Sequence, residues 1–248
     1  MTDFEPTIHR HVDSGQTCCD PDWEAAYERF ESPEEEIQKF IRRLRGFGLD
    51  RQPRDTRVVE LFCGRGGGLV ALERLGLTNI QGVDLSETLL KMYRGIATLH
   101  LADCRDLPFE NHCFDAAIVQ GGLHHLPALP EDLEAVLAEV SRILKPGGTF
   151  YVVEPWLTPF LRIVHAIVQQ PWVRRVYAKG DALAEMIEHE RETYQQWLNQ
   201  PAQVLDAFER RFDTIAPKAA WGKLLLTATT SNSDRDHPNH GSTSIGIS

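Results

Sequence analysis

The sequence predicts an α/β protein with a doubly wound sheet of seven strands, in which the final strand is antiparallel to the rest. Short β-branched or apolar runs alternate with helical patterns from residue 58 to residue 153, which is typical of parallel strands covered by helices on both faces. Two later runs, at residues 212–215 and 223–229, are separated by too few residues for a helix. These two strands are therefore expected to pair antiparallel and to close the sheet.

The N-terminal part of the chain is expected to contribute one well-defined helix before the sheet begins. Residues 1–22 are polar and are expected to form an irregular arm. Ser32, Pro33 and Glu35 then provide an N-cap, a proline at the first helical position and a capping-box glutamate. Apolar residues at helical spacing follow, and Gly46 is available to end the helix.

The central segment supplies the alternating elements that define the fold class. Strands are expected at residues 58–62, 80–83, 99–102, 116–119 and 149–153. The helices between them are expected at residues 66–75, 86–93 and 130–144. Lys145-Pro-Gly-Gly148 is a signal for a stop and a turn after the last of these helices. Together with the N-terminal helices, the predicted core domain spans residues 23–154.

The alternation breaks after the fifth strand. Residues 155–208 contain two helical patterns and no convincing strand, and this segment is too long for an ordinary crossover. We interpret residues 155–210 as a helical insertion that covers a pocket, followed by the closing strands within residues 211–230. Residues 231–248 are rich in Ser, Asn, Asp, His and Gly with few apolar anchors, so this tail is expected to be disordered.

Composition and charge narrow the function class. A net charge of -10 and a pI near 5.5 argue against a nucleic-acid partner, which is bound through clustered Lys and Arg. No apolar run approaches the roughly 20 residues that span a bilayer, and residues 1–10 lack the apolar core of a signal peptide. Five cysteines without framework spacing suggest free thiols, so we expect a cytoplasmic protein without a membrane partner. Adjacent cysteines such as Cys18 and Cys19 rarely share one tetrahedral ion, and no metal site is predicted.

A glycine-rich turn carries the most specific signal in the chain. The strand at residues 58–62 runs into Gly64 and Gly66 and then into a helical pattern. Glycines allow the backbone to approach a ligand because no side chain intervenes. Asp84 follows Gly64 by about 20 residues, a spacing suited to accepting hydrogen bonds from the two hydroxyl groups of a ribose. The pattern predicts a nucleoside-binding βαβ unit.

Further motifs follow in a fixed order along the chain. They are Glu60-Leu-Phe-Cys-Gly64-Arg-Gly66, Asp84, Ala102-Asp103-Cys104, Asp106-Leu-Pro-Phe, Phe114-Asp115, Gly122-Leu-His124-His125-Leu and Leu144-Lys-Pro-Gly-Gly148. In this order and spacing the chain resembles the class I S-adenosylmethionine-dependent methyltransferases, in particular the type 11 branch that acts on small molecules. The resemblance is specific over residues 58–153 and implies a Rossmann-like fold with S-adenosylmethionine as the methyl donor. The chain departs from the family's first motif at Phe62, which replaces the first of three glycines.

The resemblance implies roles for residues at the strand ends. Glu60 ends a buried strand, where an unpaired carboxylate would be costly, and it is expected to bind the ammonium group of the donor's methionyl part or the neighbouring backbone. The other expected cofactor-binding residues are Gly64 and Gly66 at the turn, Asp84 with the adjacent Leu85 at the ribose, Asp103 and Cys104 at the adenine, and Gln120 and Gly121 at the ammonium group.

Two histidines are candidates for catalysis. His124 and His125 directly follow the fourth strand, where a methyl acceptor would lie, and an imidazole can take a proton from a hydroxyl group near neutral pH. The alternative interpretation is a scaffold role, because methyl transfer often proceeds without a strong base. Glu154, and His189 with Glu190, are candidates for the acceptor pocket. Their alternative roles are a structural pair and a solvated helix face.

Taken together, these residues predict transfer of a methyl group from S-adenosylmethionine to a small-molecule oxygen, nitrogen or carbon. Oxygen is preferred because of the histidine pair, and Tyr27 and Phe30 are candidates to fold over the donor. Two alternatives remain open: a nicotinamide-dependent oxidoreductase, which shares the glycine turn and the ribose acid, and a non-catalytic protein that binds S-adenosylmethionine. Macromolecular acceptors are disfavoured because the helical insertion suggests an enclosed pocket. The acceptor and the oligomeric state stay open.

Overall fold

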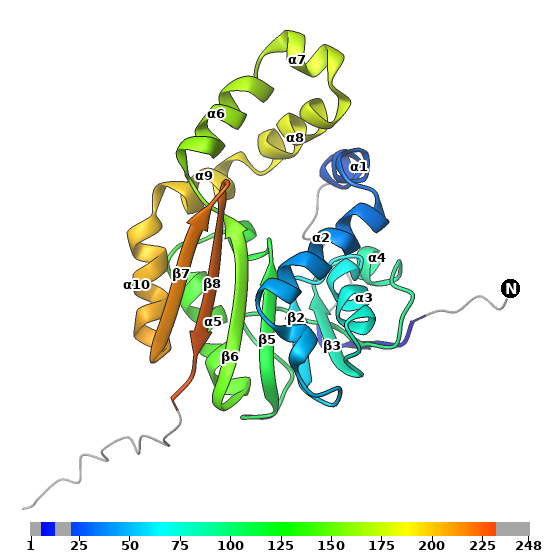
Figure 1. The fold of residues 1–248 in the computed structure, drawn as a ribbon, viewed down its shortest axis with the longest axis vertical. Coiled ribbons are helices and arrows are strands. Elements are labelled where there is room, and N and C mark those ends of the chain that lie inside the picture. Colours follow the sequence, from blue (N-terminus) through cyan, green and yellow to red (C-terminus); the bar gives the residue numbers. More distant parts are fainter. Residues whose placement is uncertain (1–5, 13–20, 232–248) are drawn as a thin grey trace, which may run out of the picture.

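The computed structural model of the protein describes residues 6–12 and 21–231. In these residues a single mixed sheet runs through the molecule in the order β1-β4-β3-β2-β5-β6-β8-β7, with helices on both of its faces (Figure 1). The strands are β1 (Ile8–Arg10), β2 (Arg57–Leu61), β3 (Asn79–Asp84), β4 (Thr98–Leu101), β5 (Phe114–Gln120), β6 (Leu144–Pro155), β7 (Thr214–Ala220) and β8 (Lys223–Thr229).

Two helices lie between β1 and β2, others connect the parallel strands, and the remaining helices fill the segment after β6. They are α1 (Pro21–Phe30), α2 (Pro33–Gly46), α3 (Gly67–Arg74), α4 (Glu87–Leu90), α5 (Glu131–Ile143), α6 (Pro159–Val168), α7 (Pro171–Val176), α8 (Ala178–His189), α9 (Arg191–Asn199) and α10 (Pro201–Arg211). Two short 3-10 helices, η1 (Leu49–Arg51) and η2 (Leu123–His125), complete the described elements.

The strand directions confirm the predicted fold class. All pairings from β1 to β6 are parallel, whereas β8 pairs antiparallel with both β6 and β7. The strand order reverses at β2, with β3 on one side and β5 on the other. In open α/β sheets the ligand crevice lies beyond the carboxyl ends of the strands at such a switch point.

The sheet differs from the sequence expectation at two places. All seven expected strands are present, but residues 8–10, expected to be irregular, form an eighth strand that pairs with β4. The second difference is Lys145-Pro-Gly-Gly148, which lies within β6 instead of ending the helix in a turn. The pairing shifts from Phe114–Leu144 to Ala116–Thr149, so the extra residues bulge out of the strand. A positive φ of 74° at Gly147 permits this bulge.

The core consists of two apolar layers, one on each face of the sheet. One layer joins the strands to α2 and α3, and the other joins them to α5, α9 and α10. Because both faces are covered, residues of β5 such as Ala117 and Val119 are fully buried. The rigid sheet therefore places its strand ends at fixed positions at one edge.

The segment after β6 was expected to be an insertion over the pocket, and its last helix differs from that expectation. Phe208 of α10 is buried and stacks on Phe150 of β6 with ring centroids 6.0 Å apart, so α10 belongs to the core layer beside α5. Helices α6 to α9 form the part that extends beyond the strand ends, and we call them the helical cover (Figure 1). Trp197 of α9 is fully buried and donates from Nε1 to the carbonyl of Pro155 at 2.8 Å, which ties the helical cover to β6.

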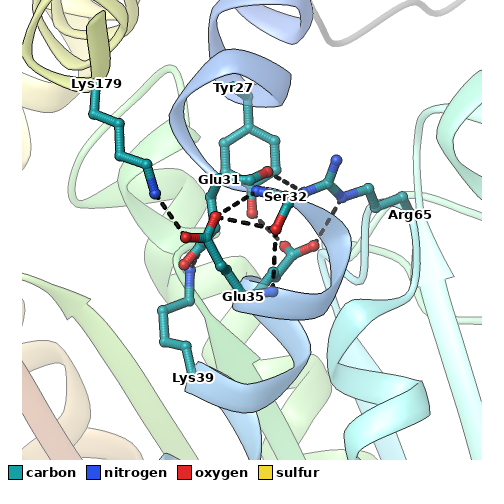
Figure 2. Close-up of polar contacts among 8 residues, drawn as sticks. Tyr27, Glu31, Ser32, Glu35, Lys39, Arg65 and Lys179 are labelled. Atoms are coloured by element: carbon teal, nitrogen blue, oxygen red, sulfur yellow. Dashed lines mark hydrogen bonds and ion pairs between the residues drawn. The ribbon is translucent and has the colours of Figure 1, made fainter.

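The N-terminal helices meet the helical cover across the same edge of the sheet. The predicted capping box is present, because the side chain of Ser32 accepts from the backbone N–H of Glu35 and the Glu35 carboxylate accepts from the backbone N–H of Ser32. Lys179 of α8 donates to Glu35 at 2.8 Å (Figure 2). A second ion pair joins Arg29 of α1 to Glu185 of α8. The predicted disordered tail begins at Ser231, and its residues after Ser231 lie outside the described residues.

Candidate functional site

A cavity of about 880 Å³ lies at the carboxyl ends of the parallel strands, between the N-terminal helices and the helical cover. Nearly all of the site residues predicted from the sequence line it. They are Glu60, Gly64, Asp84, Leu85, Asp103, Cys104, Gln120, Gly121, His124, His125, Glu154 and His189. Gly66 does not line the cavity, but its positive φ of 83° makes the turn that starts α3.

Asp84, the last residue of β3, holds the glycine-rich turn in place. Its Oδ2 accepts from the backbone N–H of Gly64 at 2.7 Å, and its Oδ1 accepts from the backbone N–H of Ser86 at 2.8 Å. Burial raises the pKa of the Asp84 carboxyl, and these two hydrogen bonds act against that shift. Each carboxylate oxygen has further lone pairs, so the side chain can fix the turn and still accept from a ribose.

Glu60 and Gln120 form a buried acceptor pair on the neighbouring strands β2 and β5. Gln120 donates from Nε2 to Oε1 of Glu60 at 3.1 Å. Glu60 Oε2 and Gln120 Oε1 are buried, and neither has a hydrogen-bond partner among the described residues. Burial, only partly offset by the Gln120 hydrogen bond, raises the pKa of Glu60 to about 8. Two unpartnered acceptors on a cavity wall suit a ligand that donates several hydrogen bonds, such as a primary ammonium group.

Gly68, on α3, allows the Glu60 carboxylate to sit against the start of that helix. A Cβ atom at Gly68 would overlap both carboxylate oxygens of Glu60. Gly68 follows the glycine-rich motif by two residues, and its contact with Glu60 is visible only in the fold. The close approach explains why a side chain is absent at this position.

Asp103, after β4, lines the cavity in partnership with a residue that the sequence did not single out. Arg105 donates to both carboxylate oxygens of Asp103, with the shortest distance 2.7 Å, and also to Asp132 at 2.8 Å. Burial acts to raise the pKa of Asp103, but the hydrogen bonds and charge of Arg105 hold it below its usual range. The carboxylate is therefore kept ionised and oriented at the cavity wall.

His124, which lines the same cavity, lies between two carboxylates. Its Nδ1 is 2.7 Å from Oε2 of Glu154, and its Nε2 is 3.7 Å from Oε2 of Glu190. Burial acts to lower the pKa of His124, but the two carboxylates outweigh it and raise the pKa to about 9. The ring of His124 is therefore protonated near neutral pH. The aromatic ring of Tyr194 packs edge-on against it.

His125 and Glu190 face each other in the same cluster. Nδ1 of His125 lies 3.1 Å from Oε1 of Glu190, and the His125 side chain keeps about a third of its surface exposed. Although burial acts in the opposite direction, hydrogen bonds from the two histidines lower the pKa of Glu190 to about 2. Glu190, at the junction of α8 and α9, thus brings the helical cover to the end of β5.

The side chains of His124, His125 and Glu190 are also close enough together to hold a metal ion. One ligand atom from each of His124, His125 and Glu190 lies within 4.8 Å of the others. A metal ligand must be an unprotonated imidazole, whereas the pKa of His124 is about 9. A metal ion bound here would therefore have to displace a proton from His124, so its affinity would fall as the pH decreases.

Tyr27 and Phe30 line the cavity from α1, as expected for residues that fold over a donor. Tyr27 donates to Glu36 of α2, and its ring lies 4.8 Å below the guanidinium group of Arg65 (Figure 2). Arg65 in turn donates to Glu36 at 2.7 Å and to the carbonyl of Glu31 at 3.0 Å. The sequence motif includes Arg65, but its buried pairing with Glu36 was not predicted. This network joins the glycine-rich turn to the N-terminal helices.

The described residues contain no helix with the length and hydrophobicity that a membrane crossing requires. The cavity is lined by apolar and aromatic side chains together with the polar groups described above and further charged side chains. A concave, mostly apolar pocket with a few placed polar groups is typical of a small-molecule site.

Known proteins share both the sequence motifs and the fold. Residues 59–152 match a family described as a methyltransferase domain. A demethylmenaquinone methyltransferase of Desulfitobacterium hafniense is 35% identical over 130 residues, which cover 42% of this chain and 49% of that protein. A ubiquinone/menaquinone biosynthesis C-methyltransferase of Geobacter sulfurreducens is 31% identical over 150 residues, covering 52% of this chain and 57% of the relative. The chain thus spans about half the length of these curated relatives.

Solved structures show the same fold at low sequence identity. A protein from Methanococcus maripaludis superposes with a TM-score of 0.58 at 14% identity, covering 91% of this chain and 99% of the other. An S-adenosylmethionine-dependent methyltransferase from Methanosarcina mazei gives a TM-score of 0.52 at 16% identity, covering 75% and 98% of the two chains. Residues 59–152 therefore form a methyltransferase domain, and the sheet with its antiparallel closing pair has the same fold as these solved structures.

Proposed function

We propose that the protein transfers a methyl group from S-adenosylmethionine to a small-molecule acceptor that carries an ionisable hydroxyl group. The observation that supports this most directly is that one cavity is lined both by the Asp84 and Glu60 carboxylates and by the His124, His125 and Glu190 cluster. A donor and an acceptor bound together in this cavity would be held next to each other. Such alignment is the main requirement for a displacement at a methyl carbon.

The donor end has groups that fit S-adenosylmethionine. Asp84 and Asp103 both line the cavity; Asp84 would accept from the ribose hydroxyls and Asp103 from the adenine amino group. The unpartnered oxygens of Glu60 and Gln120 would accept from the methionyl ammonium group. When bound, the donor supplies an electrophilic methyl group on a positively charged sulfur. A nicotinamide-dependent alternative is set aside because residues 59–152 match a methyltransferase domain.

At the acceptor end, His125 is the proposed proton acceptor. The proton of the acceptor hydroxyl passes to the imidazole of His125, while the oxygen forms the new bond to the methyl carbon and the bond between carbon and sulfur breaks, with its electron pair remaining on sulfur. The positive charge lost from sulfur thus reappears on His125, 3.1 Å from the Glu190 carboxylate. Because the pKa of His124 is about 9, we assign His124 a positioning role for Glu190 and the acceptor.

Carbon is the second candidate for the attacking atom. One curated relative is named a C-methyltransferase, and a phenolate or enolate formed by loss of the hydroxyl proton can attack through carbon as well as oxygen. The same histidine and carboxylate groups serve both outcomes. Oxygen remains our preference because the atom that would lose its proton to His125 is then also the atom that attacks, and the structure of the methylated product distinguishes the two.

The test combines donor binding with product analysis. In calorimetry, S-adenosylhomocysteine is expected to bind in the micromolar range and NAD is expected to show no heat of binding. Methyl-labelled donor is then incubated with small-molecule extract and the product is analysed by mass spectrometry. Activity on the product's precursor should fall by about 100-fold or more in His125→Ala, the usual scale for loss of a general base.

The control is His189→Ala, since His189 lines the cavity but lies outside the proton-transfer cluster. Its activity is expected to stay within a few-fold of the wild type. If His125→Ala turns over as fast as the wild type across the pH range, proton transfer to His125 is excluded. If S-adenosylhomocysteine fails to bind, the methyltransferase proposal itself fails.

A further inference from the structure

Three cationic side chains line the cavity away from the donor-binding residues. Lys39 and Arg43 lie one turn apart on α2, and Lys223 is the first residue of β8. All three are half-buried. Neither the methyltransferase motifs nor the proposed chemistry uses them. We call this group the cationic wall.

Among the described residues, only one of the three cations in the cationic wall has a close ion pair, although the carboxylates of Glu31, Glu36 and Glu154 act on Arg43 over a longer range. Lys39 forms an ion pair with Glu31. Arg43 and Lys223 have no carboxylate of the described residues within ion-pair distance, and the guanidinium group of Arg43 lies over the ring of Phe40 at 5.4 Å. Burial, together with the positive charges of Arg43 and Lys39, lowers the pKa of Lys223 to about 8. Partly buried cations that repel one another are costly unless an anion joins them.

The location of the cationic wall favours the acceptor over the donor. Lys223 pairs with Pro155 in the register of β8 and β6, and Pro155 follows Glu154, which holds His124. The donor's ribose and ammonium groups are expected at Asp84, Glu60 and Gln120, on strands β3, β2 and β5. In the sheet order β3-β2-β5-β6-β8, the start of β8 lies two strands beyond β5 on the side of the histidine cluster.

We propose that Lys39, Arg43 and Lys223 form a subsite for an anionic group, a carboxylate or a phosphate, on the methyl acceptor. This inference rests on the proposed function, because it concerns the acceptor of that reaction. The lining of the same cavity also includes apolar side chains, among them Leu161 and Ile187. The matching acceptor has an ionisable hydroxyl group and an anionic group separated by an apolar body.

Benzoate is a suitable probe, because it joins a carboxylate to an apolar ring, and benzamide is its uncharged counterpart. Both are titrated by NMR into protein saturated with S-adenosylhomocysteine, so that the donor site is filled. Benzoate is expected to bind the wild type more tightly than benzamide does. Lys223→Met and Arg43→Met should each weaken benzoate binding by about tenfold or more, the scale of one lost charged hydrogen bond, and leave benzamide binding unchanged.

Two variants provide controls. Lys218→Met removes an exposed lysine of β7 outside the cavity and is expected to bind benzoate as the wild type does. Lys223→Arg keeps the charge and is expected to retain most of the binding. Inorganic phosphate, titrated in the same way, tests the second anion and should show the same dependence on Lys223 and Arg43.

The outcomes separate this inference from the proposed function. If neither benzoate nor phosphate binds the loaded wild type, or if both bind Lys223→Met and Arg43→Met as well as the wild type, the anionic subsite is wrong. If these variants instead lose affinity for S-adenosylhomocysteine, the cationic wall holds the donor's carboxylate and the acceptor assignment is overturned. If the wild type does not bind S-adenosylhomocysteine at all, it is the methyltransferase proposal that fails.

Discussion

Nδ1 of His124 lies 2.7 Å from Oε2 of Glu154, while Oε1 of the same carboxylate accepts from the backbone N–H groups of Gly122 and Leu123 at 2.8 Å each. One almost fully buried side chain at the end of β6 therefore fixes both the loop after β5 and the imidazole within it. The sequence presented Glu154 and His124 as separate candidates, 30 residues apart. In the fold they are one unit, and its charge state controls the acceptor end of the cavity.

The first prediction concerns this pair and the pH dependence of stability. The pKa of His124 is about 9 in the folded protein and about 6.5 for an unperturbed histidine. The carboxylates that raise the pKa of His124 stabilise the folded protein fully below about pH 6.5. This stabilisation is lost as the pH rises through 9. The free energy of unfolding should fall over this window by at most about 3 kcal/mol from His124, measured by urea denaturation.

The matched variant for that measurement is Glu154→Gln, which keeps the side-chain shape but removes the charge that raises the pKa of His124. Its free energy of unfolding should be lower at pH 6.5 and should change less between pH 6.5 and 9. NMR titration of the His124 ring should show a lower pKa in the variant. An unchanged pKa would show that Glu154 does not govern the charge of His124.

The second prediction links donor affinity to Glu60. The pKa of Glu60 is about 8 in the protein alone, so this carboxyl is protonated at pH 6. An ammonium group binds the ionised form, and binding at pH 6 must release the proton. Affinity for S-adenosylhomocysteine should therefore rise from pH 6 to pH 8, by up to about tenfold per pH unit. Calorimetry in Glu60→Gln should show weaker binding without this rise, and a pH-independent affinity in the wild type would contradict the prediction.

The third prediction tests the ribose acid. Asp84→Asn replaces one acceptor oxygen by an amide that faces a backbone N–H of Gly64 or Ser86. The affinity for S-adenosylhomocysteine should fall by about 10- to 100-fold, the scale of one or two hydrogen bonds to a charged group. Glu87→Gln is the control, because Glu87 is an acid near the same strand end whose partners, Arg10 and Lys91, lie outside the cavity lining. Equal affinity of the Asp84→Asn protein and the wild type would remove Asp84 from the donor site.

The fourth prediction uses the contact between Gly68 and Glu60. A methyl group in Gly68→Ala would overlap the Glu60 carboxylate, so Glu60 or the start of α3 must move. The free energy of unfolding should fall by about 1–3 kcal/mol, as is usual for overpacking, and donor affinity should fall with it. Gly46→Ala is the control, because no atom lies within 4 Å of a Cβ atom there. If the two variants unfold alike, the close approach at Gly68 is not present in solution.

The part of the site around Gly64 and Asp84 could be predicted from the sequence because its residues follow local rules. Gly64 and Asp84 stand at the ends of adjacent parallel strands, and strand, turn and helix patterns place them within about 20 residues of each other. The fold class followed in the same way from alternating elements. The hydrogen bond from the Gly64 backbone to Asp84 is the direct consequence of that local order.

The acceptor side could not be predicted to the same extent, because its contacts join segments that are far apart in the chain. His124 lies near Glu190 of the helical cover, and the positive charges of Arg43 and Lys223 repel each other although the residues are 180 positions apart. No periodicity in the sequence encodes which helix of the cover returns to β5. The bulge at residues 145–148 was missed for a related reason: proline and glycine usually end an element, but the neighbouring strands hold β6 in place on both sides of the bulge.

The pairs Lys179–Glu35 and Arg29–Glu185 close the seam between the helical cover and the N-terminal helices with partly exposed charges. Exposed ion pairs contribute little free energy, and dissolved salt weakens them further. Adding salt should therefore weaken these two ion pairs and leave the buried contact of Trp197 with β6 intact. If product leaves between α8 and the N-terminal helices, turnover limited by product escape would quicken as salt is added.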